Sequence, residues 1–106
     1  MAQGIVDLTK DSFAKQIGQG LTLVDFWAPW CGPCRMQTPV LEQLASKIED
    51  RATIAKVNVD EEPDLAAEYA IRSIPALILF KDGEPVQQLV GLQQESKLQA
   101  LIDENA

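Results

Sequence analysis

The chain has 106 residues, 46% of them apolar, and its 9 basic and 16 acidic side chains give a formal net charge of -7 at pH 7. This size and composition predict one domain spanning residues 1–106 around a single core. The acidic charge argues against nucleic acid and anionic membranes as partners, because both attract clustered lysine and arginine. The absence of histidine excludes Ser-His-Asp and Cys-His catalysis, which leaves two cysteines as the soft nucleophiles.

The N-terminal ten residues have neither the basic nor the apolar stretch of a signal peptide, and the longest apolar run, 76–80, is too short to span a bilayer. We therefore expect a soluble, cytoplasmic protein without a membrane partner. In that reducing compartment two cysteines are more often catalytic or metal-binding than structural.

The first predicted helix follows capping side chains at positions 9–12 and ends at the glycines of positions 18 and 20. Residues 21–27 come next and are apolar on both alternating faces, except at Thr22 and Asp25. Such a pattern is typical of a central strand that is covered on both sides.

A long helix is predicted to begin near Gly32-Pro33, because apolar side chains recur with a period of 3.6 residues. Its expected buried face consists of Met36, Val40, Leu41, Leu44, Ala45 and Ile48. Residues 52–59 read as a second strand, so that the strand, helix and strand form a right-handed crossover with parallel strands.

The second half of the chain predicts a helix from Glu62-Pro63 to Ala70, a strand at 76–80, and a turn at 81–83 that leads into an antiparallel strand at 86–90. The closing helix is expected to bury Leu98, Leu101 and Ile102. Helices on both faces of a mixed sheet make a three-layer α/β sandwich.

The stretch Trp30-Cys31-Gly32-Pro33-Cys34 stands between the end of the buried strand and the start of the long helix. A cysteine at a helix N-terminus faces free backbone N–H groups and the positive end of the helix dipole, which favour the thiolate. Cys31 is therefore the expected nucleophile. Cys34, one turn later, can attack a mixed disulfide formed at Cys31.

Two other interpretations of the cysteine pair stay open on the residues alone. A zinc site would need two further ligands, and without histidine the chain offers only carboxylates. A purely structural disulfide is the other possibility, but closing so short a loop removes little unfolded-state entropy.

Three segments together, Val24-Asp25-Phe26-Trp27-Ala28, Trp30-Cys31-Gly32-Pro33-Cys34 and Ile74-Pro75, resemble the bacterial-type thioredoxins over essentially the whole chain. The resemblance implies the thioredoxin fold, a mixed sheet flanked by four helices. It implies a protein disulfide reductase that binds no cofactor and no metal, and that receives electrons from NADPH through a flavoprotein thioredoxin reductase. The implied protein is a monomer with disulfide-containing clients, such as ribonucleotide reductase, peroxiredoxins and methionine sulfoxide reductase.

Asp25 is anomalous, because its neighbours place a carboxylate inside the sheet, where burial should raise its pKa. In the functional interpretation it accepts the proton of Cys34, directly or through water. The alternative is a carboxylate that caps loop N–H groups. Lys56 lies beside Asp25 if the two strands are neighbours, as the resemblance favours, and is otherwise a snorkelling surface lysine.

Pro75 on its own is ordinary punctuation at the start of a strand. The resemblance implies instead that it is a cis-proline next to the cysteines, where the backbone of Ile74 pairs with an extended client segment. Trp30 is by composition as compatible with the core as with a contact surface. The resemblance predicts a client-binding surface made of Trp30, Gly32, Pro33, Ile74, Pro75 and Gly91.

Two competing functions remain. A disulfide oxidase is disfavoured, because such relatives hold a histidine between the cysteines, where this chain has Gly32-Pro33. A non-redox binding subunit of a larger assembly is compatible with every feature of the sequence.

Overall fold

The computed structural model describes residues 4–106 of the chain, and within them it has five strands and four α-helices in the order β1-α1-β2-α2-β3-α3-β4-β5-α4. The strands are β1 (Ile5–Asp7), β2 (Leu21–Trp27), β3 (Thr53–Asn58), β4 (Ala76–Lys81) and β5 (Glu84–Val90). The helices are α1 (Lys10–Ile17), α2 (Gly32–Ile48), α3 (Pro63–Glu68) and α4 (Glu95–Asn105), and a short 3₁₀ helix at Glu49–Arg51 follows α2.

The strands form one mixed sheet in the order β1-β3-β2-β4-β5. β1, β3 and β2 are parallel, whereas β4 runs antiparallel to both β2 and β5. β2 is central and is buried along its length except at the partly exposed Trp27, which confirms the doubly covered strand expected from its apolar residues. The parallel β2-α2-β3 crossover and the β4-β5 hairpin are confirmed as well.

The edge strand β1 was not predicted. It has only three residues and pairs with β3 from Ile5↔Ile54 to Asp7↔Lys56. Only Ile5 of the three is buried, so hydrophobic alternation leaves almost no trace. Such a strand depends on backbone pairing with β3, which the sequence does not display.

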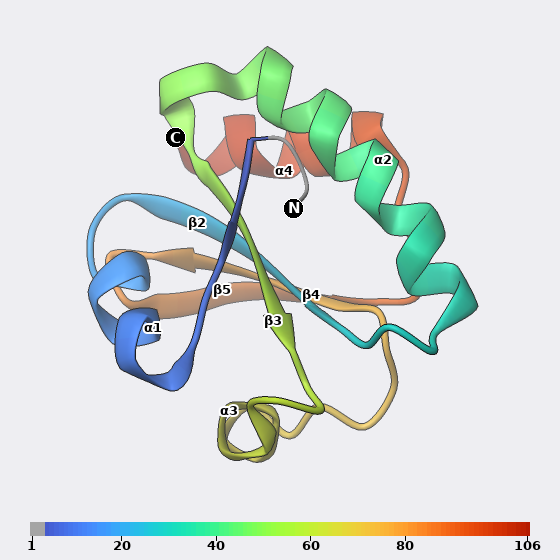
Figure 1. Ribbon diagram of the computed structural model, residues 1–106. Helices are drawn as coiled ribbons and strands as arrows, with labels where there is room; N and C mark the ends of the chain where they lie inside the picture. Colours follow the sequence, from blue (N-terminus) through green and yellow to red (C-terminus); the bar gives the residue numbers. More distant parts are fainter. Residues whose placement is uncertain (1–3) are drawn as a thin grey trace.

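Helices α2 and α4 lie on one face of the sheet, and α1 and α3 lie on the other (Figure 1). Alternate residues of β2 therefore enter two cores: Leu23 packs with α2 and α4, while Val24 and Phe26 pack on the α1 side. This arrangement is the expected three-layer sandwich. Within the described residues, none of the helices has the length and hydropathy to cross a membrane.

The buried face of α2 differs at its start from the face predicted. Met36 is 61% exposed, so its assignment to the core was wrong. The residues buried on α2 are Cys34, Gln37, Leu41, Leu44 and Ile48. They are spaced by three or four residues, and Met36 lies off this stripe because Cys34 and Gln37 occupy the inward positions of the first turns.

Helix α3 also ends earlier than predicted, at Glu68 rather than Ala70. Tyr69 already leaves the helical conformation, and Ala70 has a φ of 54°, in the left-handed region that stops a helix.

Candidate active site

The two cysteines meet where β2 leads into α2. Cys31 is the N-cap of α2, Pro33 lies in its first turn, and Cys31 and Cys34 form a disulfide. The Cys34 backbone N–H donates to Cys31 Sγ at 3.2 Å, so one of the free donors of the helix N-terminus points at this sulfur. The expected placement of both sulfurs within bonding reach is confirmed.

Both cysteines are buried in the disulfide form: the relative exposure of Cys31 is 5%, against 0% for Cys34. Cys31 is still the more accessible of the two. Its neighbours in the chain, Trp30, Gly32 and Pro33, are exposed.

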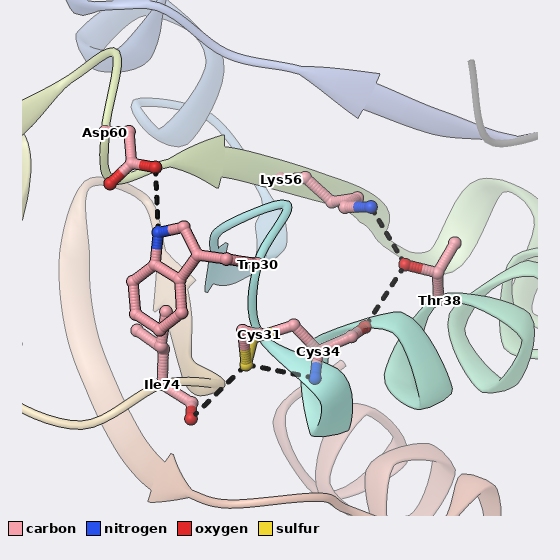
Figure 2. Close-up of a disulfide and its surroundings, with 7 residues drawn as sticks. All are labelled: Trp30, Cys31, Cys34, Thr38, Lys56, Asp60 and Ile74. Atoms are coloured by element: carbon pink, nitrogen blue, oxygen red, sulfur yellow. Dashed lines mark hydrogen bonds between the residues drawn. A yellow bond between two sulfur atoms is a disulfide. The ribbon is translucent and has the colours of Figure 1, made fainter.

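Trp30 lies on the surface beside Cys31, with 67% of its area exposed. Its indole Nε1 donates to Asp60 Oδ2 at 2.9 Å, which fixes the ring next to the dithiol (Figure 2). This position excludes a core role for Trp30. Trp27, at the end of β2, is partly buried.

The Ile74-Pro75 peptide bond is cis, as the resemblance implies. The Ile74 carbonyl oxygen lies 3.7 Å from Cys31 Sγ, and Figure 2 shows it pointing at the sulfur. A disulfide sulfur carries no hydrogen, so this contact can become a hydrogen bond only in the reduced protein. On the other side, the Gly91 N–H donates to the Pro75 carbonyl at 2.8 Å, with Gly91 at a φ of 89° that favours glycine.

Asp25 is fully buried in β2, where it is in register with Lys56 on β3 and Leu77 on β4. Neither carboxylate oxygen has a hydrogen-bond partner among the described residues, so the capping alternative is wrong. Burial raises the pKa of Asp25 to about 7, and the positive charge of Lys56 limits the rise. Asp25 can therefore gain and lose a proton near neutral pH.

Lys56 is buried with 7% exposure, so it is not a snorkelling surface lysine. Its Nζ lies 4.0 Å from the centre of the Trp27 ring and donates to Thr38 Oγ1 at 2.8 Å. Thr38 Oγ1 in turn lies 3.4 Å from the Cys34 carbonyl oxygen, to which it donates (Figure 2). The amino group of Lys56 is thus bound to the second turn of α2 rather than to the Asp25 carboxylate across the strands.

Sequence reasoning missed two polar residues near the dithiol, Gln37 and Thr38. Gln37 is fully buried and hydrogen-bonded to the backbone of Gln93, and Thr38 links Lys56 to Cys34. A signal for Gln37 exists in retrospect, because it stands three residues after Cys34 and four before Leu41, on the stripe that α2 buries.

The described residues show no group of three or more cysteine, aspartate or glutamate side chains that could hold a metal ion. The site joins a cysteine pair at a helix N-terminus to a backbone carbonyl beside the outer sulfur, and the neighbouring strand β2 holds a buried carboxyl group without a hydrogen-bond partner.

The sequence and the structure of this chain are similar to those of known proteins. The thioredoxin family model matches residues 4–104. Thioredoxins of Staphylococcus epidermidis and Staphylococcus aureus are each 50% identical over 101 residues, covering 95% of this chain and 97% of the relative. A mutant thioredoxin from Halobacterium salinarum has a similar structure, with a TM-score of 0.90 at 39% identity, covering 98% of this chain and 92% of that chain.

Proposed function

Because this chain belongs to the thioredoxin family and is a thiol–disulfide oxidoreductase that works by dithiol–disulfide exchange, we propose that it is a general reductase of protein disulfides. The observation that carries the proposal is the Cys31–Cys34 disulfide at the start of α2, with the Ile74 carbonyl beside Cys31. A cysteine pair placed there can exchange its disulfide with the thiols and disulfides of a client.

In the proposed reaction the Cys31 thiolate attacks one sulfur of a client disulfide, forms a mixed disulfide and expels the other client sulfur as a thiolate. The Cys34 thiolate then attacks Cys31 Sγ, closes the intramolecular disulfide and expels the second client thiolate. Two electrons pass from the dithiol to the client. The two protons lost by Cys31 and Cys34 end on the two client sulfurs, by way of solvent or a protein base.

Cys31 is proposed as the nucleophile because it is the more accessible cysteine and its sulfur accepts the Cys34 N–H. A negative charge on this sulfur is stabilised by that donor and by the helix dipole. Cys34, which is fully buried, needs a base inside the protein. Asp25 fits this role because its pKa of about 7 lets it accept a proton at neutral pH.

Lys56 supports the same step from β3. Its register opposite Asp25 brings a positive charge to the carboxylate, and its bond to Thr38 connects it to the turn that carries Cys34. We assign Lys56 the role of stabilising the ionised form of Asp25, which arises when Asp25 gives up its proton.

The proposed client-binding surface surrounds Cys31. A client segment in extended conformation would pair with the backbone at Ile74, next to the cis bond, in the manner of an added strand. The exposed ring of Trp30 supplies apolar contact area beside it. The full set is Trp30, Gly32, Pro33, Ile74, Pro75 and Gly91.

The cycle needs a two-electron reductant, and we assign this role to NADPH acting through a flavoprotein thioredoxin reductase. Family membership supports that partner and disulfide-containing clients in general. Ribonucleotide reductase, peroxiredoxins and methionine sulfoxide reductase are proposed as client classes. We further propose that the chain acts in the cytoplasm as a monomer of one domain spanning residues 1–106.

Reduction of insulin by the prereduced protein tests the function. Oxidation of the Cys31 and Cys34 thiols is measured by acid quenching at set times and alkylation of the thiols that remain. We expect turnover that Cys31→Ser abolishes, while Cys34→Ser accumulates a mixed disulfide with insulin. If the wild-type protein leaves insulin intact, and if Cys31→Ser binds a partner as well as the wild-type protein does, the chain is a binding subunit instead.

The roles of the two cysteines are tested separately by labelling the reduced protein with iodoacetamide. Faster labelling of Cys34 than of Cys31 would reverse the two roles.

A further inference from the structure

Gln37 makes a paired contact between α2 and the loop of residues 91–94, which follows β5. Its side chain is fully buried one turn beyond Cys34. The amide Oε1 accepts the Gln93 N–H at 2.7 Å, and the amide Nε2 donates to the Gln93 carbonyl at 3.0 Å. Both polar atoms of this buried group therefore bind the backbone of a single loop residue.

The side chain of Gln93 continues the contact toward the proposed client surface. Its Nε2 donates to the carbonyls of Val90 at 3.2 Å and Gly91 at 3.1 Å. The Gly91 N–H then donates to the carbonyl of Pro75. An unbroken set of hydrogen bonds and covalent links thus runs from the dithiol helix, through residues 91–94, to the cis-proline beside Cys31.

The residue type at position 37 matters for this contact. The backbone N–H of Gln93 needs an acceptor, and its backbone carbonyl needs a donor close by. The primary amide of a glutamine side chain carries both in one planar group. Methionine has a similar length but would satisfy neither group, and glutamate would lack the donor. Residues 91–94 contain no helix or strand, and Leu92 among them is exposed, so neither regular backbone pairing nor burial of Leu92 holds this loop. The side-chain hydrogen bonds of Gln37 and Gln93 hold it instead.

We infer that Gln37 is a positioning residue, which fixes residues 91–94 so that an extended client segment meets Cys31 in the reactive orientation. The inference rests on the proposed function, because it concerns how a protein client is held. A small disulfide that reaches Cys31 without touching this loop gains nothing from Gln37. Loss of the contact should therefore slow exchange with protein disulfides and spare exchange with small ones.

The test compares single-turnover oxidation of the prereduced protein by insulin and by bis(2-hydroxyethyl) disulfide. For Gln37→Met we expect about a tenfold lower rate constant with subsaturating insulin and an unchanged rate with the small disulfide, because misplacement affects only the oriented reaction. Hydrogen exchange of the Gln93 amide should become faster in the same variant. Gln93→Ala, which removes the two bonds to Val90 and Gly91 without emptying a core position, should show the same split in rates.

Thr22→Val is the matched control, because it also removes a buried side-chain hydrogen bond, from Thr22 to the Gln16 carbonyl, at a site away from residues 91–94. It should leave both rates as they are. Equal slowing with both disulfides, or no slowing in a folded Gln37→Met or Gln93→Ala variant, overturns the inference. A wild-type protein that oxidises with the small disulfide but never with insulin refutes the proposed function instead.

Discussion

Two buried polar regions, one between α2 and the loop of residues 91–94 and one around Asp25 in the sheet, are built on opposite principles. On the loop side, both amide atoms of Gln37 bind the backbone of Gln93. On the sheet side, both oxygens of the equally buried Asp25 lack a hydrogen-bond partner, although Lys56 lies in register with it. The loop side follows the general rule that buried polar groups are paired, and the sheet side breaks it.

The contrast separates two uses of a buried polar side chain. A fully paired amide holds two segments in one geometry, since every alternative leaves donors and acceptors unsatisfied. An unpaired carboxyl group stabilises nothing, but its pKa moves to about 7, where proton transfer is easiest near neutral pH. In the mechanism that we propose, Gln37 controls the position of the client loop and Asp25 controls proton transfer.

The largest effect is expected for Asp25→Ala. Its folded pKa of about 7 exceeds the unfolded value of 3.8, so the folded protein binds the proton more tightly. Below pH 3.8 Asp25 is protonated in both states, and the folded protein has its full stability. As the pH rises from 3.8 to about 7, the free energy of unfolding falls, and above this window the buried Asp25 has lowered it by about 4 kcal/mol. Asp25→Ala should be more stable than wild type at pH 8 and about tenfold slower in insulin reduction.

Denaturant unfolding at pH 5 and pH 8 separates this titration from the cavity that alanine leaves, because the cavity cost is the same at both values. The stability difference between variant and wild type should grow by about 3 kcal/mol from pH 5 to pH 8. A difference that does not change with pH would show that Asp25 is not the titrating group.

Gln37→Met is expected to behave in the opposite way. It leaves the Gln93 N–H and carbonyl without their side-chain partners, which should lower the free energy of unfolding by about 2 kcal/mol. No charge is involved, so the loss should be the same at pH 5 and pH 8. Paired denaturant melts at the two pH values measure it, and a loss that varies with pH would remove the distinction between the two regions.

Much of this architecture could be predicted from sequence, since β2, α2 and the β4-β5 hairpin have clear hydrophobic periodicity and turn residues. The strand β1 could not, because three residues carry too short a pattern. Met36 was misplaced because its side chain is apolar and it lies one position away from the buried face of α2, so the pattern predicts a core residue. Gln37 occupies that buried face, but its polar side chain predicts a surface position.

The same limit applies to the site. Cys31, Cys34 and Asp25 could be recognised, because the dithiol and the lone carboxylate in an apolar strand are local features. The Gln37–Gln93 contact joins residues 56 positions apart, and one partner contributes only its backbone, which every residue possesses. The binding of Lys56 to Thr38 was hidden too, since register placed Lys56 opposite Asp25 but said nothing of the direction of its amino group.

That direction leads to the smallest of the expected effects. In Thr38→Val the Lys56 amino group loses the hydroxyl that it now binds at 2.8 Å. Two acidic residues are in register with Lys56, Asp7 on β1 and Asp25 on β2, and Asp25 is the buried one. A shift of the amino group toward the carboxylate stabilises the ionised form and lowers the pKa of Asp25 below its present value of about 7. The sheet side then becomes paired, like the loop side.

A lower folded pKa brings Asp25 closer to its unfolded value, so Thr38→Val should lose less stability between pH 5 and pH 8 than wild type does. One pKa unit corresponds to about 1.4 kcal/mol of that loss. At pH 5, where Asp25 is protonated, the variant should be less stable by about 1 kcal/mol, because the bonds of the Thr38 hydroxyl to Lys56 and to the Cys34 carbonyl are lost without an ion pair in return. Thr38→Ser, which keeps the hydroxyl, should follow the wild-type pH curve. An unchanged or upward-shifted stability step in Thr38→Val would mean that Lys56 does not reach Asp25, and that the carboxyl group stays unpaired even when its neighbour is released.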